Sequence, residues 1–137
     1  MTLLKSIFAG MAVMLLVSAA AMSQAKVIAV VNHADWCGTC KANGERAMTV
    51  FSEFNPDGTI QFVVNDLTND ATKKASAKTL KEHGLYKAME EKRKTALVYF
   101  FDAQSKELIN EISVGKSNEE IASAMKTAQK GSKSKID

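Results

Sequence analysis

A continuous apolar run constrains the fold of this chain more than any other feature. Residues 27–31 read Val-Ile-Ala-Val-Val, without alternation of polar and apolar side chains. Such a run is typical of a strand that is buried on both faces, as in a parallel sheet covered by helices. From about Cys37 to Phe54 the apolar residues instead fall on one side of a helix. These two patterns predict the α/β class.

The remaining patterns extend this order along the chain. Further strands are expected over residues 60–64, 96–101 and 107–114, and helices over residues 71–83 and 117–131, with Asp70 as the cap of the first. A charged stretch over 86–94 is expected to add a helical turn or two. The core order is β-α-β-α-β-β-α. Strands joined by helices are expected to be parallel, and the last two, joined by a short turn, antiparallel.

The first 25 residues differ in composition from the rest. Lys5 is their only charged residue, an apolar run covers residues 7–17, and the segment ends on Ser23-Gln24-Ala25. A basic start, an apolar stretch and small residues before a cleavage point are typical of a secretory signal peptide. We therefore predict a signal peptide over 1–25, one domain over 26–131 and a flexible tail over 132–137. An uncleaved membrane anchor is the alternative.

Composition excludes several classes of protein. Hydrophobic residues make up 46% and charged residues 24% of the 137 residues, which is ordinary for a globular chain and excludes wholesale disorder. The formal net charge of +3 is too small to indicate a nucleic-acid partner. Two cysteines exclude a multi-disulfide scaffold and a four-cysteine zinc site within one chain.

Both cysteines share one short motif at the predicted junction of strand and helix. It reads Trp36-Cys37-Gly38-Thr39-Cys40-Lys41. Two intervening residues on a first helical turn allow the sulfurs to bond, and the helix N-terminus favours a thiolate on Cys37. Because the thiolate is the attacking species in disulfide exchange, Cys37 is the candidate nucleophile. Cys40, expected to be more buried, is the candidate for releasing the partner from the mixed disulfide.

This motif, with Ala34 and Asp35 before it, resembles the active-site signature of the thioredoxin superfamily, in particular of secreted or membrane-anchored disulfide reductases. The resemblance covers residues 26–130. It implies a thioredoxin-like core, a mixed four-stranded sheet flanked by helices, without the usual extra N-terminal strand and helix. It also implies that Trp36 shields the cysteine pair, that Gly38 and Thr39 flank the sulfurs, and that neither a cofactor nor a metal is bound.

Three positions depart from the family's pattern. Thr39 stands where thioredoxins usually carry proline, which leaves the redox potential open. Ala96, preceded by Thr95, occupies the place of the family's cis-proline. A trans bond is expected there, because a cis bond without proline costs about 2.5–4 kcal/mol. Ala96→Pro is therefore expected to restore a more thioredoxin-like groove. Val31 replaces a buried acid that helps to move protons, so resolution by Cys40 is expected to be slow.

His33 lies four residues before Cys37 and is a candidate for flanking the active site. A nearby imidazolium would stabilise a thiolate, and a neutral imidazole could accept a proton. The alternative is a polar residue at the end of a strand.

A basic cluster precedes Thr95 and consists of Lys87, Lys92, Arg93 and Lys94, interrupted by two glutamates. It could form a rim that steers a redox partner with an acidic surface. The alternative is a solvated face without a partner, which is the usual role of such charge runs.

Taken as a whole, the sequence predicts a secreted, periplasmic thiol-disulfide oxidoreductase that acts on protein thiols and disulfides through a Cys37–Cys40 dithiol. The alternatives are a non-enzymatic thioredoxin-like binding module and a periplasmic metal-handling protein. For the motif itself, a structural or relic pair and metal transfer stay open. No nucleic acid is expected as a partner, and a membrane only if residues 1–25 stay uncleaved.

Overall fold

The computed structural model describes residues 25–132. The predicted signal peptide lies outside these residues except for Ala25, and the predicted tail lies outside them except for Ser132. Within residues 25–132 no helix is both long enough and apolar enough to cross a membrane.

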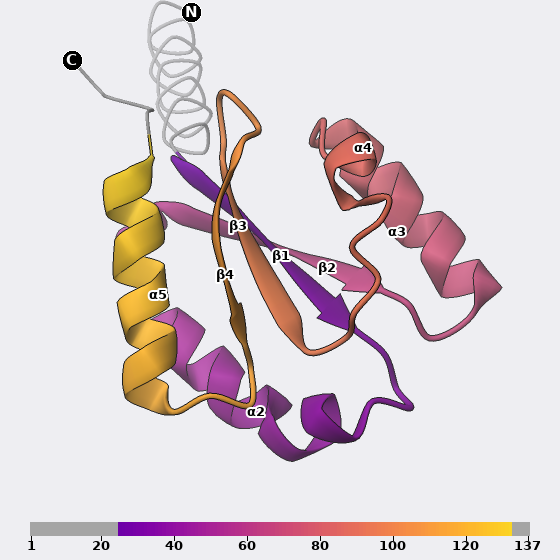
Figure 1. Cartoon of the computed structure of the whole chain (residues 1–137), viewed down its shortest axis with the longest axis horizontal. Helices are drawn as coiled ribbons and strands as arrows, with labels where there is room; N and C mark the ends of the chain where they lie inside the picture. Colours follow the sequence, from indigo (N-terminus) through magenta and orange to yellow (C-terminus); the bar gives the residue numbers. More distant parts are fainter. Residues whose placement is uncertain (1–24, 133–137) are drawn as a thin grey trace, which may run out of the picture.

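A mixed four-stranded sheet forms the centre of the molecule, in the strand order β2-β1-β3-β4 (Figure 1). The strands are β1 (Val27–His33), β2 (Ile60–Asp66), β3 (Leu97–Asp102) and β4 (Leu108–Ser113). β1 pairs in parallel with β2 and antiparallel with β3, and β3 pairs antiparallel with β4. The strand with the continuous apolar run therefore lies in the interior of the sheet, as predicted.

Helices cover both faces of this sheet (Figure 1). α2 (Gly38–Glu53) and α5 (Asn118–Gly131) lie on one face, and α3 (Asp70–Glu82) and the short α4 (Tyr86–Met89) lie on the other. The predicted α/β class and the thioredoxin-like arrangement of a mixed four-stranded sheet between helices are both confirmed.

Two separate cores explain why the apolar run of β1 has no alternation. Val27 and Ala29 are buried against α2 and α5. Ile28 and Val30 are buried against α3 and α4. Because both faces of β1 are covered, both sets of side chains are apolar.

The prediction that strands joined by helices are parallel is correct for β2 and wrong for β3. α3 brings the chain back from the carboxyl end of β2, but the segment after α4 then returns to the carboxyl end of β1. There the Ala96 N–H donates to the Asn32 carbonyl (2.8 Å). β3 therefore starts at that edge and runs antiparallel to β1. The presence of helices between β2 and β3 could not by itself predict that the chain returns to this edge before β3.

The ends of the helices refine the predicted boundaries. The N-cap of α3 is Asn69 and not Asp70, because the Asn69 side chain accepts the Thr72 N–H (3.0 Å) in a capping box. The predicted capping box of α5 is confirmed between Ser117 and Glu120. Ser132, predicted to begin the tail, is the C-cap of α5, and its hydroxyl donates to the Lys26 carbonyl (3.0 Å).

Candidate active site

Cys37 lies at the point where the chain leaves the loop after β1 and enters α2. It is the N-cap of this helix, with extended backbone angles (φ −79°, ψ 112°), and the Cys40 N–H donates to its Sγ (3.2 Å). A sulfur thus occupies the place where serine or aspartate usually caps a helix. Both cysteines are free thiols.

The two thiols are nearly equally buried, with 6% exposure for Cys37 and 8% for Cys40. Exposed surface therefore does not separate the two thiols, although Cys40 is the more deeply enclosed by neighbouring atoms, as predicted. The Thr95–Ala96 segment contacts both thiols by hydrogen bonds. What distinguishes the thiols is their hydrogen bonding.

The hydrogen bonds around the sulfurs move the two pKa values in opposite directions. Burial alone would raise the pKa of Cys37, but hydrogen bonds from the side chains of Cys40 and Thr95 and from the N–H groups of Cys40 and Thr39 outweigh it and lower this pKa. Burial raises the pKa of Cys40, and the neighbouring Cys37 adds to that rise. Cys37 is therefore the more acidic of the two thiols, as the attacking cysteine should be.

The segment Thr95–Ala96 faces both cysteines, as its predicted match to the family's cis-proline position requires. The Thr95 side chain hydrogen-bonds Cys37, and the backbone of Ala96 hydrogen-bonds Cys40. No peptide bond in residues 25–132 is cis, so the expected trans bond is confirmed. Ala96 instead adopts a φ of +66°, in the left-handed region that favours glycine.

This backbone angle makes Ala96→Pro incompatible with the observed loop, contrary to the sequence-based expectation. Proline fixes φ near about −65° and has no N–H. The Ala96 N–H donates to the Asn32 carbonyl (2.8 Å) at a buried position. Ala96→Pro is expected to lower the free energy of unfolding by at least about 2 kcal/mol, because it leaves that carbonyl unpaired and forces the loop to move.

Ala96→Gly is expected to leave the free energy of unfolding within about 0.5 kcal/mol of wild type. Relief of the left-handed strain, about 1–2 kcal/mol, offsets the lost methyl burial and the greater freedom of unfolded glycine. The matched control is Ala47→Gly, also buried but inside α2, which is expected to lose about 1.5–2 kcal/mol. Urea unfolding measures both; equal losses would contradict strain at Ala96.

A buried asparagine at the end of β1 fixes the segment that leads into Thr95. Asn32 is fully buried, and its Nδ2 donates to the carbonyls of Lys92 (2.8 Å) and Lys94 (3.1 Å). Its Oδ1 accepts from Asn65 Nδ2 on β2 (2.9 Å). Sequence reasoning missed both asparagines. The signal was available, because β1 and β2 each end in Val-Val-Asn followed by a polar residue.

A second network ties α2 to the turn after β4. The Arg46 guanidinium donates to the Asn43 side chain (2.8 Å), the Val114 carbonyl (2.9 Å) and the Asn118 side chain (2.6 Å). Val114 in turn donates its N–H to the Ala96 carbonyl (2.9 Å). Arg46 was also missed, since an arginine inside a predicted helix carries no local signal of such a role.

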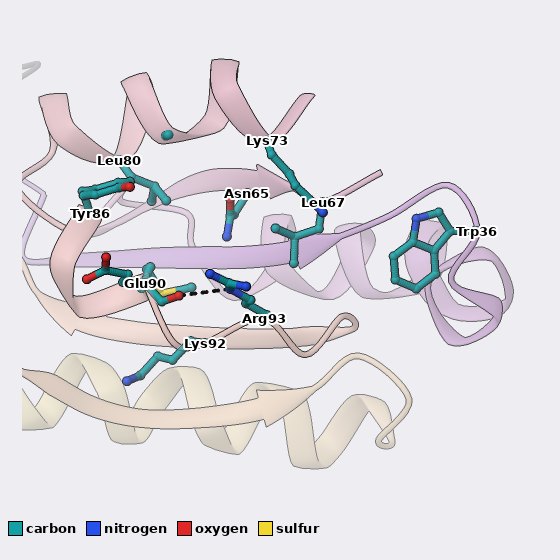
Figure 2. A pocket seen from close by; sticks show the side chains of 11 residues that line it. Trp36, Asn65, Leu67, Lys73, Leu80, Tyr86, Glu90, Lys92 and Arg93 are labelled. Carbon is teal, nitrogen blue, oxygen red and sulfur yellow. Dashed lines mark hydrogen bonds between the residues drawn. The ribbon is translucent and has the colours of Figure 1, made fainter. Parts of the chain in front are cut away.

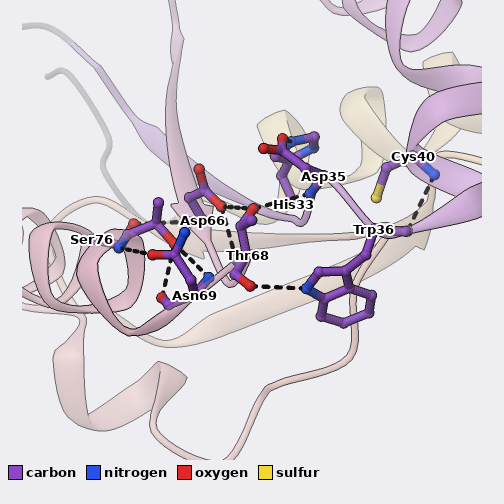
Figure 3. Close-up of polar contacts among 10 residues, drawn as sticks. His33, Asp35, Trp36, Cys40, Asp66, Thr68, Asn69 and Ser76 are labelled. Atoms are coloured by element: carbon purple, nitrogen blue, oxygen red, sulfur yellow. Dashed lines mark hydrogen bonds and ion pairs between the residues drawn. The ribbon is translucent and has the colours of Figure 1, made fainter.

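His33 and Trp36 lie near the cysteines, and both are engaged elsewhere (Figure 3). His33 Nε2 lies 3.0 Å from Asp35 Oδ1, and His33 contributes to neither of the thiol pKa shifts. The Trp36 indole is 63% exposed and donates to the Thr68 carbonyl (3.0 Å). Trp36 therefore anchors the loop before Cys37 to the loop after β2, and its shielding of the cysteine pair stays a prediction.

Val31 lies beside an apolar cavity of about 490 Å³ that reaches Cys40 from beneath α2. In the sheet Val31 pairs with Val64 of β2, so the neighbouring strand offers no titratable group at this position. His33 and Glu45 are the ionisable residues at the cavity besides Cys40. Slow resolution by Cys40 stays a prediction.

The other two candidate residues, Gly38 and Thr39, lie at the N-terminus of α2. Gly38 and Thr39 form its first turn, and Thr39 lies against the turn at Gly115, where an added Cβ would come within 3.2 Å of Thr39 Cγ2. Within residues 25–132 no group of three or more histidine, cysteine or acidic side chains is placed to hold a metal ion.

Comparison with known proteins gives likenesses of fold at low sequence identity. No family model matches the chain, and no curated protein matches it. A solved structure of Trxlp from Edwardsiella tarda is similar at 16% identity, covering 79% of this chain and 89% of that one, with a TM-score of 0.48. Thioredoxin f2 from Chlamydomonas reinhardtii is similar at 19% identity, covering 76% and 81%, with a TM-score of 0.49. The Malassezia sympodialis thioredoxin Mala s 13 is similar at 16% identity, covering 78% and 82%, with a TM-score of 0.46.

The strand order, the mixed pairing and the helices on both faces give this chain a thioredoxin-like fold. Its cysteine pair lies at the start of the first helix after β1, with one thiol capping that helix. A pair placed in this way is suited to thiol–disulfide exchange.

Proposed function

We propose that this protein is a thiol–disulfide oxidoreductase that exchanges disulfides with protein substrates through Cys37 and Cys40. The observation that carries the proposal is the geometry of the pair at the start of α2, where Cys37 is the N-cap and its Sγ accepts the Cys40 N–H (3.2 Å). In this position hydrogen bonds lower the pKa of Cys37, whereas burial raises the pKa of Cys40. A nucleophile needs thiolate character, and a resolving thiol must stay protonated until the mixed disulfide has formed.

The exchange runs in two balanced steps. The Cys37 thiolate attacks one sulfur of a substrate disulfide, forming a mixed disulfide and releasing one substrate thiolate. Cys40 then loses its proton to solvent and attacks the Cys37 sulfur, which releases the second substrate thiolate. The protein loses two electrons as its dithiol becomes a disulfide, and the substrate gains them. The reverse sequence oxidises a substrate dithiol.

Reduction of insulin disulfides in the presence of excess dithiothreitol tests this activity. Wild-type protein is expected to accelerate the precipitation of reduced insulin chains above the rate with dithiothreitol alone. A protein that gave no acceleration would favour the non-enzymatic binding module, and stoichiometric metal binding by the reduced protein would favour metal handling.

We also propose that the protein is secreted, into the periplasm if the cell has one, after cleavage behind Ala25. Support comes from the composition of residues 1–25 and from the oxidising compartments in which protein disulfides persist. N-terminal sequencing of the exported protein is expected to begin at Lys26. A retained Met1 would contradict cleavage and favour a membrane anchor.

A further inference from the structure

A cavity of about 430 Å³ opens beside Trp36, on the face of the sheet that α3 and α4 cover (Figure 2). Its apolar lining comes mainly from α3, α4 and the loop after β2, namely Leu67, Ala77, Leu80, Tyr86 and Met89. Its charged lining is Lys73, Lys92, Arg93 and Glu90. The cavity thus combines apolar surface with an excess of positive charge.

Two of these cations face the cavity from opposite sides. Figure 2 shows Lys73 reaching down from α3 and Arg93 reaching in from the segment before β3, whereas Lys92 turns away. Arg93 Nε donates to the Glu90 carbonyl (3.3 Å), which is a neutral backbone group. Within residues 25–132 no carboxylate lies within ion-pair distance of Lys73 or Arg93, so neither cation is neutralised there.

The position of the cavity connects it to the reacting thiol. Trp36 lines it and directly precedes Cys37 in the chain. The indole is fixed by its bond to the Thr68 carbonyl, while the residue as a whole stays 63% exposed. A peptide whose cysteine reaches Cys37 can therefore pass over the indole and place a flanking residue in the cavity. Lys73, on α3, was not part of the basic cluster singled out in the sequence.

We propose that this cavity, lined by Trp36, Lys73 and Arg93, selects acidic substrate segments: an apolar side chain enters it while a neighbouring carboxylate lies between the two cations. The inference rests on the proposed function and names its substrate class. Attraction between an acidic substrate and cations at the mouth of a site raises the rate of association more than the final affinity. Salt screens this attraction.

The test is the rate at which a peptide disulfide oxidises the reduced protein in a single turnover. Two disulfide-linked peptide dimers serve as probes, one with the sequence Glu-Glu-Leu-Cys-Gly and the other with lysines in place of the glutamates. Trp36, the only tryptophan in the chain, reports the reaction by its fluorescence. The acidic peptide is expected to react about tenfold faster at low salt, with the difference shrinking as salt is added.

Lys73→Glu and Arg93→Glu are each expected to remove most of this preference. Lys126→Glu is the matched control, because it makes the same change of charge at an exposed position of α5, on the opposite face of the sheet. Equal rates for the two peptides, or an equal loss of preference in the control, would overturn the cavity's role while leaving the exchange activity standing. Failure of both peptides to oxidise the protein would overturn the exchange activity as well.

Discussion

Cys37→Ser is expected to abolish acceleration of insulin reduction, a loss of at least about 10³-fold, because serine at pH 7 supplies no anion that can attack a disulfide. The fold should survive, since a serine hydroxyl is a common N-cap and can accept the same Cys40 N–H that Cys37 Sγ accepts now (3.2 Å). Turbidity of the reduced insulin chains measures the activity, and the urea midpoint checks folding. Activity retained in a folded Cys37→Ser protein would contradict the assignment of the nucleophile.

Cys40→Ser gives the complementary result. The first step still occurs, so this variant is expected to accumulate a stoichiometric mixed disulfide with a peptide disulfide, visible by intact mass spectrometry. The same adduct in Cys37→Ser at a comparable rate would show that the two thiols have equal roles.

The pH dependence of alkylation follows from the direction of each pKa shift. Iodoacetamide reacts with thiolates, so the rate at each cysteine falls about tenfold per pH unit below its pKa. Because the pKa of Cys37 is lowered, its rate should stay high to a lower pH than that of an ordinary thiol near about 8.5. Because the pKa of Cys40 is raised, its reaction should need a higher pH. Peptide mapping after brief alkylation measures both rates, and a reversed order would contradict the roles assigned.

Local sequence patterns were enough to predict the helices and strands and to locate the cysteine motif. The run at residues 27–31 is typical of an interior strand, because a strand with one exposed face usually alternates polar and apolar residues. The helix that begins after Cys37 could be expected from its spacing. The direction of β3 could not, because it depends on contacts between Asn32 and the segment at Lys92 and Lys94, about 60 residues further on.

The surroundings of the cysteines were also only partly predictable from the sequence. Thr95 and Ala96 were placed beside the motif by resemblance to a family pattern, and their positions are confirmed. The left-handed angle of Ala96 had no signal, because alanine is not a residue that marks such angles. Lys73 and Arg93 line the same cavity but lie on different segments of the chain. The sequence could not predict that they meet, because only the tertiary structure brings these segments together.

Asn32 joins Asn65 to the carbonyls of Lys92 and Lys94, and this asparagine bridge is the basis of the second prediction with a large effect. Asn32→Leu is expected to lower the free energy of unfolding by about 3 kcal/mol, because it leaves Asn65 Nδ2 and the carbonyls of Lys92 and Lys94 without their partner. Asn32→Asp is expected to cost at least as much. A buried carboxylate keeps an acceptor for Asn65 but sets negative charge against the two carbonyls that now receive the amide N–H groups. Urea unfolding measures both losses.

A second readout separates positioning of the active site from simple stability. If Asn32 holds the segment that presents Thr95 to Cys37, its loss weakens a hydrogen bond that lowers the pKa of Cys37. In Asn32→Leu the alkylation profile of Cys37 should therefore move to higher pH, measured in protein that is still folded without denaturant. Asn110→Leu is the matched control, since the Asn110 amide donates to the Ala124 carbonyl (3.0 Å) between β4 and α5. It should alter stability without moving the Cys37 profile. An unchanged profile in folded Asn32→Leu would show that the asparagine bridge stabilises the sheet edge and has no part in setting the reactivity of the thiol.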